Sequence, residues 1–423
     1  MTHYTTMSSN LKRGILRFSE AVSTGLSRPE LKFISQMIYG MLAAQSCHLS
    51  NIARSLGENV TLKKTIDRLS RNLGAFRDGG KLRENAVGKL KGCLTDKSVL
   101  IIDGGDITKP CSPKMEYIDR VRDGSTGEYG NGYHTISVTA LTPEKKMPIC
   151  VYSEVFSASE PGFVSEDEEV LKALKFIGRH FSKKCIRAFD RGYDANIYYE
   201  HLIKNIEKFI IRAKKNRYVL YQGEKVNILE LAGRYKGKYS LTFRKKNGVQ
   251  SGCKVSIVPI GLPCKPDAQL NLVVCNGLGK IPMMLITNMK SDDKRLAVTV
   301  VKVYLMRWRI EEFYAFKKQQ FGLEDLRVRS LNSIRNLDLL LSIAIGYIGY
   351  MSAKGDEGRV VMELIHISKR IFEPPKFFFF ALADAMFTVF SRAKPGFSYL
   401  LRKNPKDPQL SLWTLPRLFP LQL

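Results

Sequence analysis

The chain is short of acidic residues. It has 40 aspartate and glutamate residues against 67 lysine and arginine residues, which gives a formal net charge of +27. A charge so far from neutral favours an anionic partner, and the usual partners are nucleic acids or acidic membrane surfaces. The hydrophobic share of 44% is that of an ordinary soluble globular protein. The imbalance therefore indicates a globular protein that binds a polyanion, with nucleic acid the first candidate.

Long apolar runs and metal-binding cysteine patterns are also missing. The most apolar run, residues 339–351, is too short to cross a bilayer and is interrupted by Gly346 and Gly349. The amino terminus is polar and has no apolar core, so we expect no signal peptide. None of the eight cysteines forms a CxxC pair or a zinc-like pattern with histidine. We therefore expect reduced thiols in a cytoplasm and no zinc site.

The first 95 residues are expected to be helical. The stretch HLSNIARSLGENVTLKKTIDRLSRNL predicts a short helix, a glycine break and a second helix, on which Lys64, Arg68 and Arg71 share a face. This pattern resembles a helix-turn-helix with a basic second helix. A helical cap with a solvated charged face is the alternative, and the pattern does not decide between them.

From residue 97 the periodicity becomes that of strands. KSVLIID predicts a buried strand that terminates on Asp103, and CIRAFD predicts another that terminates on Asp190. Two further strands and a helix lie between them, and a helix and a strand follow. This order is the one expected of an RNase H-like α/β core. Both aspartates could then meet at one edge of the sheet.

Residues 212 to about 290 interrupt this order with short strand-like runs. Between Arg212 and Lys246 we count eleven basic against two acidic residues, with aromatic residues interleaved. Basic residues alternating with aromatic ones on β-structure suit a nucleic-acid surface, although a solvated sheet face would look similar. A long helix is expected from about residue 295 to 320. The last hundred residues should be helical, with a polar, proline-rich tail.

The segment VYLMRWRIEEFYAFKK places one carboxylate among cationic and phenolic groups. At 100° per residue, Tyr304, Arg307, Glu311 and Lys318 fall within about 60° of one another on the helix. Two-metal phosphoryl transfer needs oxygen ligands that hold two cations about 3.5–4 Å apart. Aspartates after adjacent strands and a glutamate on a packed helix could supply them. Histidine is dispensable to this chemistry, and the chain has only six.

Three segments, in order, resemble the catalytic blocks of a known family. The spacing of Tyr304, Arg307, Glu311 and Lys318 looks like the YREK signature of bacterial insertion-sequence transposases of the DDE class, the IS-four family. IIDGGDITKP resembles the first block of that family, and AFDRGYDANIYYEHL with FIIRAKKNR resembles the second. The resemblance covers roughly residues 97 to 350.

The resemblance implies a fold and a chemistry. The fold would be an RNase H-like core interrupted by a mostly β insertion domain, with helical regions at both ends. Two Mg2+ or Mn2+ ions would be held by Asp103, Asp190 and Glu311. Such an enzyme hydrolyses the DNA at the element's inverted-repeat ends and joins the freed 3′ hydroxyls to target DNA. It acts as a synaptic homodimer or a larger assembly, in the bacterial cytoplasm beside the nucleoid.

The same resemblance suggests DNA contacts and region boundaries. Tyr304, Arg307 and Lys318 would contact phosphates of the element's ends, and Arg212 would be a further DNA contact. The expected regions are a helical DNA-end-binding region, the first part of the core, the β-rich insertion, the second part of the core and a C-terminal helical region: 1–95, 96–212, 213–290, 291–350 and 351–423.

The sequence departs from the family at two points. Some members hold a flipped base with a tryptophan of the insertion, whereas the only tryptophans here are Trp308 and Trp413. A hairpin route would need a tyrosine or Trp308 in that role. The first block has DGGD, which makes Asp106 a rival to Asp103 as the first ligand. We prefer Asp103, because it terminates the predicted strand while Asp106 is expected in the turn.

Other carboxylates and other functions remain as alternatives. Asp194 is expected to cap the helix after Asp190, and Glu312 to form a salt bridge beside Glu311. An RNase H-like nuclease without strand transfer would share the three carboxylates but leave the YREK spacing unexplained. A transposase-derived DNA-binding protein without catalysis would keep the charge and the fold. A glycosidase fits neither the basic charge nor the scarcity of tryptophan.

Overall fold

The structure is a computed structural model. It describes residues 2–124, 126–244, 250–291, 293–353, 358–368, 377–393 and 396–397. The expected polar tail and Trp413 lie outside the described residues.

The strands form one large mixed sheet, flanked by helices. Its order is β2-β3-β1-β5-β6-β12-β11-β10-β7-β8, with β4 paired to β3 and β9 paired to β10. The strands are β1 (Val99–Thr108), β2 (Asp119–Arg122), β3 (Tyr129–Leu141), β4 (Pro148–Phe156), β5 (Ile186–Phe189), β6 (Lys208–Arg212), β7 (Tyr218–Tyr221), β8 (Glu224–Asn227), β9 (Tyr239–Arg244), β10 (Gln250–Leu262), β11 (Lys265–Asn276) and β12 (Met283–Thr287). The chain is therefore mixed α/β, as expected.

The register of β1 places the two expected aspartates side by side. β1 and β5 pair in parallel, and Ile102 lies opposite Phe189, so Asp103 and Asp190 are the next residues on neighbouring strands. Their carboxylates are therefore brought to the same part of the sheet. The expectation that Asp103 terminates its strand is wrong: β1 continues to Thr108, because its antiparallel pairing with β3 extends beyond its pairing with β5. Asp106 therefore lies in the strand and not in a turn.

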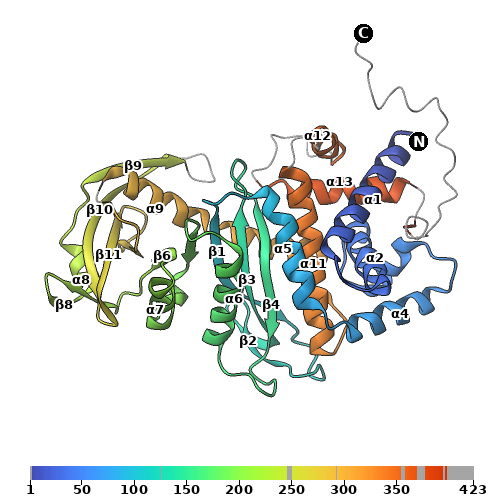
Figure 1. Ribbon diagram of the computed structural model, residues 1–423, viewed down its shortest axis with the longest axis horizontal. Coiled ribbons are helices and arrows are strands. Elements are labelled where there is room, and N and C mark those ends of the chain that lie inside the picture. The colour runs from blue at the N-terminus through green and yellow to red at the C-terminus, as the bar shows by residue number, and fades with distance from the viewer. Residues whose placement is uncertain are drawn as a thin grey trace, which may run out of the picture.

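The strands of residues 213–290 continue the same sheet. β12 pairs antiparallel with β6, β11 pairs with β12, and β10 pairs with β11. In Figure 1 the yellow strands β10 and β11 lie at one end of the molecule, and β1, β3 and β4 lie near its middle. β7 and β9, which lie in the basic segment identified in the sequence, both pair with β10, so that segment extends the sheet that carries the aspartates.

Helices pack at the opposite end and across the sheet. The N-terminal helices α1, α2 and α4 lie beside α11 at that end (Figure 1). The helices are α1 (Thr2–Val22), α2 (Arg28–Ala44), α3 (Leu49–Leu56), α4 (Leu62–Ala75), α5 (Gly79–Leu90), α6 (Glu166–His180), α7 (Asn196–Lys204), α8 (Ile228–Gly233), α9 (Lys294–Met306), α10 (Arg309–Ala315), α11 (Leu331–Ala353), α12 (Gly358–Ile367) and α13 (Phe379–Arg392). α11 is long and apolar enough to cross a membrane by length and composition, but 94% of its most apolar stretch is buried inside the protein. It serves here as the central core helix between the helical end and β4.

The expected pair of helices in the N-terminal region is confirmed, but its basic face is smaller than predicted. α3 ends at Gly57, whose φ of 56° is left-handed, and α4 begins after Thr61. The guanidinium group of Arg68 donates to Gln36 of α2 at 2.7 Å and to Glu58 at 2.7 Å. Arg68 therefore joins α4 to its neighbours, and Lys64 and Arg71 remain exposed on α4.

The long helix expected over about 295–320 is interrupted. α9 ends at Met306, α10 begins at Arg309, and a π-helical turn (Phe316–Gln320) follows α10. The break falls at Arg307 and Trp308, so the YREK residues are spread along the segment: Tyr304 on α9, Arg307 in the break, Glu311 on α10 and Lys318 in the π-helical turn. A single straight helix therefore does not describe how these side chains are aimed, and their positions must be taken from the contacts below.

Candidate active site

The three carboxylates predicted from the sequence are linked through residues of the α9–α10 segment. The hydroxyl of Tyr304 donates to Oδ1 of Asp190 at 3.2 Å. The guanidinium group of Arg307 donates to Oδ2 of Asp103 at 2.8 Å and to Oε1 of Glu311 at 2.6 Å. The structure therefore brings Asp103, Asp190 and Glu311 into one cluster, with Tyr304 and Arg307 among them.

The cluster is only partly open to solvent. The side chain of Arg307 is 11% exposed, that of Asp103 18% and that of Glu311 36%. Burial raises the pKa of Asp103 to about 7, and the negative charges of Asp190 and Glu311 add to this effect while Arg307 opposes it. The same carboxylates raise the pKa of Arg307 against the effect of its burial. A positive charge among these carboxylates is thus strongly favoured.

The donor set suits a hard divalent cation, but the described arrangement does not enclose one. Mg2+ and Mn2+ prefer carboxylate oxygens, and Asp103, Asp190 and Glu311 offer such oxygens from two strands and a helix. Within the described residues, no three acidic, histidine or cysteine side chains converge closely enough to hold a metal ion. Arg307 lies between Asp103 and Glu311, where its guanidinium group supplies the positive charge that a metal ion would bring. The chemistry of the donor set therefore fits a divalent cation, and binding one would require Arg307 to move aside and the carboxylates to approach one another.

Lys318 lies in a second group of charges along β1. Its ammonium group contacts Oδ2 of Asp106 at 2.6 Å and Oε1 of Glu324 at 2.9 Å. Glu324 also accepts hydrogen bonds from the backbone and hydroxyl of Thr108 at 3.0 and 2.7 Å. The carboxylate of Asp106 is engaged further by the backbone N–H of Gly124 at 3.0 Å. Asp106 is therefore paired with Lys318, whereas Asp103 is the aspartate linked to Glu311.

Arg212 and Trp308, also predicted to contact DNA, flank the first cluster. Arg212 ends β6, and its side chain interacts with the hydroxyl of Tyr304. Trp308 follows Arg307 directly and is 51% exposed. Arg212 therefore reaches the cluster through Tyr304, and Trp308 is next to it in sequence.

Two subsidiary predictions have opposite outcomes. Glu312 forms the expected salt bridge, with Arg309 at 2.6 Å. The prediction that Asp194 caps α7 is wrong, because the residue at the cap position is Ala195 and it makes no side-chain cap. The buried carboxylate of Asp194 instead accepts from the Tyr199 hydroxyl, the Lys214 backbone and Arg217 at 2.7–2.9 Å. It ties the loop after β5 to the loop after β6.

Several residues around the site had no recognised signal in the sequence. Tyr314, on α10, donates its hydroxyl to the backbone carbonyl of Asp103 at 2.7 Å. Lys317 is buried and paired with the buried Asp338 of α11. Glycine inside a strand indicates a close approach by another group. The two glycines after Asp103 could therefore have indicated that a side chain such as Tyr314 packs against this part of β1.

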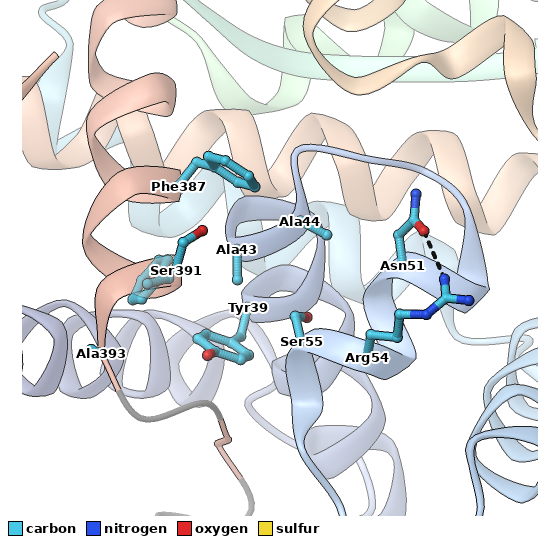
Figure 2. A pocket seen from close by; sticks show the side chains of 10 residues that line it. Tyr39, Ala43, Ala44, Asn51, Arg54, Ser55, Phe387, Ser391 and Ala393 are labelled. Atoms are coloured by element: carbon cyan, nitrogen blue, oxygen red, sulfur yellow. Dashed lines mark hydrogen bonds between the residues drawn. The ribbon is translucent and has the colours of Figure 1, made fainter. Parts of the chain in front are cut away.

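A separate hollow lies among the helices at the other end of the molecule. Figure 2 shows it between Tyr39 of α2, Arg54 of α3 and Phe387 of α13, with Asn51 hydrogen-bonded to Arg54. Its lining contains no carboxylate and so lacks the groups for metal-dependent chemistry. The acidic cluster on β1 and β5 is therefore the better candidate for a catalytic centre.

Comparison with known proteins assigns the chain to a family. No curated protein matches it. Among solved structures, it is similar to a piggyBac transposase in a synaptic complex with hairpin DNA, with 13% identity and a TM-score of 0.40 over 97% of this chain and 82% of that one. Residues 94–346, more than half of the chain, match the family described as the transposase DDE domain. These residues include both clusters described above, and the chain therefore belongs to the DDE-domain family of transposases.

Proposed function

We propose that this protein binds the inverted-repeat ends of an insertion sequence, cleaves them by metal-dependent hydrolysis and joins the 3′ hydroxyl ends to target DNA. The observation that carries the proposal is that Arg307 bridges Asp103 and Glu311 while the neighbouring Tyr304 donates to Asp190, so one short segment links all three carboxylates. The net charge of +27 supports a polyanionic substrate. Within the DDE-domain family, we assign the chain to the IS-four type with the YREK signature.

The finer fold assignment is also a proposal. We assign β1, β3, β4, β5 and β6 with their helices to an RNase H-like core, and residues 213–290 to its insertion. The parallel pairing of β1 with β5 and of β5 with β6 supports this assignment. We assign recognition of DNA ends to residues 1–95, where Lys64 and Arg71 are exposed on α4.

Each residue of the cluster has a proposed role. Asp103, Asp190 and Glu311 would hold two Mg2+ or Mn2+ ions. Bound divalent cations activate an attacking water or hydroxyl and offset charge on the phosphate and leaving oxygen. Arg307 would exchange its carboxylate partners for a DNA phosphate, which matches the planar donor pair of a guanidinium group. Tyr304 would orient Asp190 and contact the DNA backbone.

The remaining assignments concern DNA contacts, partners and location. Arg212 and Lys318 would contact DNA phosphates, and Trp308 would stack on an exposed base. The partners would be double-stranded DNA and a second copy of this chain in a synaptic homodimer. We place the protein in the bacterial cytoplasm, beside the nucleoid.

The direct test uses linear duplexes that carry candidate inverted-repeat ends, incubated with Mg2+ or Mn2+. The proposal expects metal-dependent nicking at the element end, followed by joining of the 3′ end to a second duplex. Tight binding of ends with no cleavage in either metal would support a DNA-binding protein that has lost catalysis. The observation favouring that second candidate is Arg307, which occupies the space between two carboxylates. Cleavage without joining would indicate a nuclease.

Asp103 and Asp106 are both candidates for the first metal ligand, and the Mn2+ affinities of their asparagine variants distinguish them. We expect Asp103→Asn to weaken Mn2+ binding by at least about tenfold, because a ligand of the cation loses its charge. Asp106→Asn should leave Mn2+ binding within about twofold, because Asp106 is paired with Lys318 and Gly124. Electron paramagnetic resonance of free Mn2+ measures both affinities. The reverse ranking would assign the first ligand to Asp106.

Arg307 should compete with metal ions for the carboxylates. We expect Arg307→Ala to bind Mn2+ about tenfold more tightly than the wild type when DNA is absent. The reason is that a hydrogen bond to a charged group contributes about 1.5–3 kcal/mol and 1.4 kcal/mol is a tenfold change in affinity. The same variant should bind DNA ends less tightly. Unchanged or weaker Mn2+ binding by Arg307→Ala would show that Arg307 does not compete with Mn2+ for the carboxylates.

A further inference from the structure

Two glycines separate Asp103 from Asp106 in the middle of β1. A methyl group built on Gly105 would lie 3.1 Å from the ring carbon Cζ of Tyr314 and 2.8 Å from the hydroxyl of Thr135. One built on Gly104 would lie 3.2 Å from the hydroxyl of Tyr193. Successive residues of a strand face opposite sides of the sheet, so the two tyrosines approach β1 from opposite faces. The glycines give each ring room to reach the backbone beside Asp103.

Tyr314 connects the helix of Glu311 with the strand of Asp103. It lies three residues after Glu311 on α10, so the two residues are neighbours on the helix surface. Its hydroxyl donates to the main-chain carbonyl of Asp103 at 2.7 Å. The contact therefore joins the elements that carry two of the three carboxylates, and it acts on the backbone of Asp103 and does not occupy its carboxylate.

The hydroxyl of Tyr314 is itself held in place. Ser137, which lies opposite Asp103 in β3, interacts with it. The Ser137 hydroxyl lies 3.2 Å from that of Ser153, and Ser153 donates to Asp338 of α11 at 2.6 Å. This series of contacts connects Tyr314 to the core of the protein. Because Tyr314 belongs to α10 and its hydroxyl is held at β1, we expect it to restrict movement of α10 relative to β1.

We propose that Tyr314 is a positioning residue that sets the separation of Asp103 and Glu311 required for metal binding, and that Gly105 is glycine to admit it. The inference rests on the proposed function, because it assumes that these carboxylates hold the cation. Groups that orient metal ligands from behind commonly change metal affinity or activity by about 10- to 100-fold when they are removed. We expect an effect of that size from the loss of one hydroxyl.

The test is Tyr314→Phe, which keeps the ring and removes the hydrogen bond to Asp103. We expect the Mn2+ dissociation constant, measured by electron paramagnetic resonance on the protein alone, to rise about 10-fold or more. The Mn2+ concentration that half-saturates DNA cleavage should rise in parallel. DNA-end affinity and the thermal unfolding temperature should stay close to those of the wild type.

A matched control is Tyr133→Phe. Tyr133 is a buried tyrosine of β3 whose hydroxyl donates to the main-chain carbonyl of Glu116 at 2.6 Å. It loses the same type of hydrogen bond away from the carboxylates, so its Mn2+ affinity should not change. Gly105→Ala, which keeps the tyrosine hydroxyl but crowds its ring, should weaken Mn2+ binding as Tyr314→Phe does.

Glu311→Gln separates failure of this inference from failure of the proposed function. If Glu311→Gln weakens Mn2+ binding and Tyr314→Phe leaves it unchanged, the metal site stands and the role of Tyr314 is overturned. If neither variant changes Mn2+ binding, the carboxylates do not hold the cation, and both proposals are overturned. Equal weakening by Tyr314→Phe and Tyr133→Phe would also overturn the inference, because it would show a general effect of losing a buried hydroxyl.

Discussion

Replacing Glu311 with glutamine should lower metal-dependent DNA cleavage by about a thousandfold or more. The substitution keeps the size of the side chain and its hydrogen bond to Arg307, but it removes the negative charge that would hold the cation. Bound metal contributes several kcal/mol of transition-state stabilisation, and about 1.4 kcal/mol corresponds to a tenfold change in rate. The measurement is the single-turnover rate of nicking at a saturating concentration of Mn2+.

The neighbouring residue provides the control for this variant. Glu312 is also on α10 but is paired with Arg309 at 2.6 Å, outside the carboxylate cluster. Glu312→Gln should therefore cleave within a fewfold of the wild type. Both variants should bind DNA ends with wild-type affinity when metal is absent. Comparable losses in the two variants, or normal cleavage by Glu311→Gln, would contradict the assignment of Glu311 as a ligand.

Replacing Lys317 with methionine should destabilise the protein by about 3–5 kcal/mol, the usual cost of leaving one member of a buried ion pair without its partner. The side chains of Lys317 and Asp338 are 2% and 1% exposed, and their charged groups are in contact. Lys317 also donates to Ser342 at 3.1 Å. The free energy of unfolding in urea measures the effect.

An exposed ion pair and a double variant serve as controls. Lys172, 54% exposed and paired with Glu169, should cost less than about 1 kcal/mol on replacement by methionine. The double variant Lys317→Met/Asp338→Leu should recover most of the lost stability, because two apolar groups no longer leave a charge without a partner. If Lys317→Met alone is as stable as the wild type, the pair does not stabilise the junction between the π-helical turn and α11.

The proximity of the two aspartates could be predicted from the sequence because each comes directly after an apolar run that forms a buried strand. The apolar runs before Asp103 and Asp190 identified two neighbouring strands, and parallel pairing then fixed their proximity. Glu311 was predicted by spacing, and the structure links it to Asp103 through Arg307, while its role as a metal ligand stays a prediction. Local patterns were sufficient where the residue lies on, or next to, a regular element with a clear apolar face.

Other features depend on contacts between distant segments and could not be predicted. β1 continues beyond Asp103 because β3 pairs with it, and no local signal in KSVLIID reveals that partner. The break at Arg307 and Trp308 lies within a pattern that is helical by periodicity. Lys318 was expected beside Glu311, but the break and the π-helical turn aim it at Asp106. These differences arise from tertiary packing, which local periodicity does not contain.

The most direct test of the account is anomalous diffraction from crystals of the protein bound to a DNA end and Mn2+. The account predicts two Mn2+ sites about 4 Å apart or less, ligated by Asp103, Asp190 and Glu311, with Arg307 on a DNA phosphate. Mn2+ bound elsewhere, or Arg307 still bridging Asp103 and Glu311 with DNA in place, would contradict it.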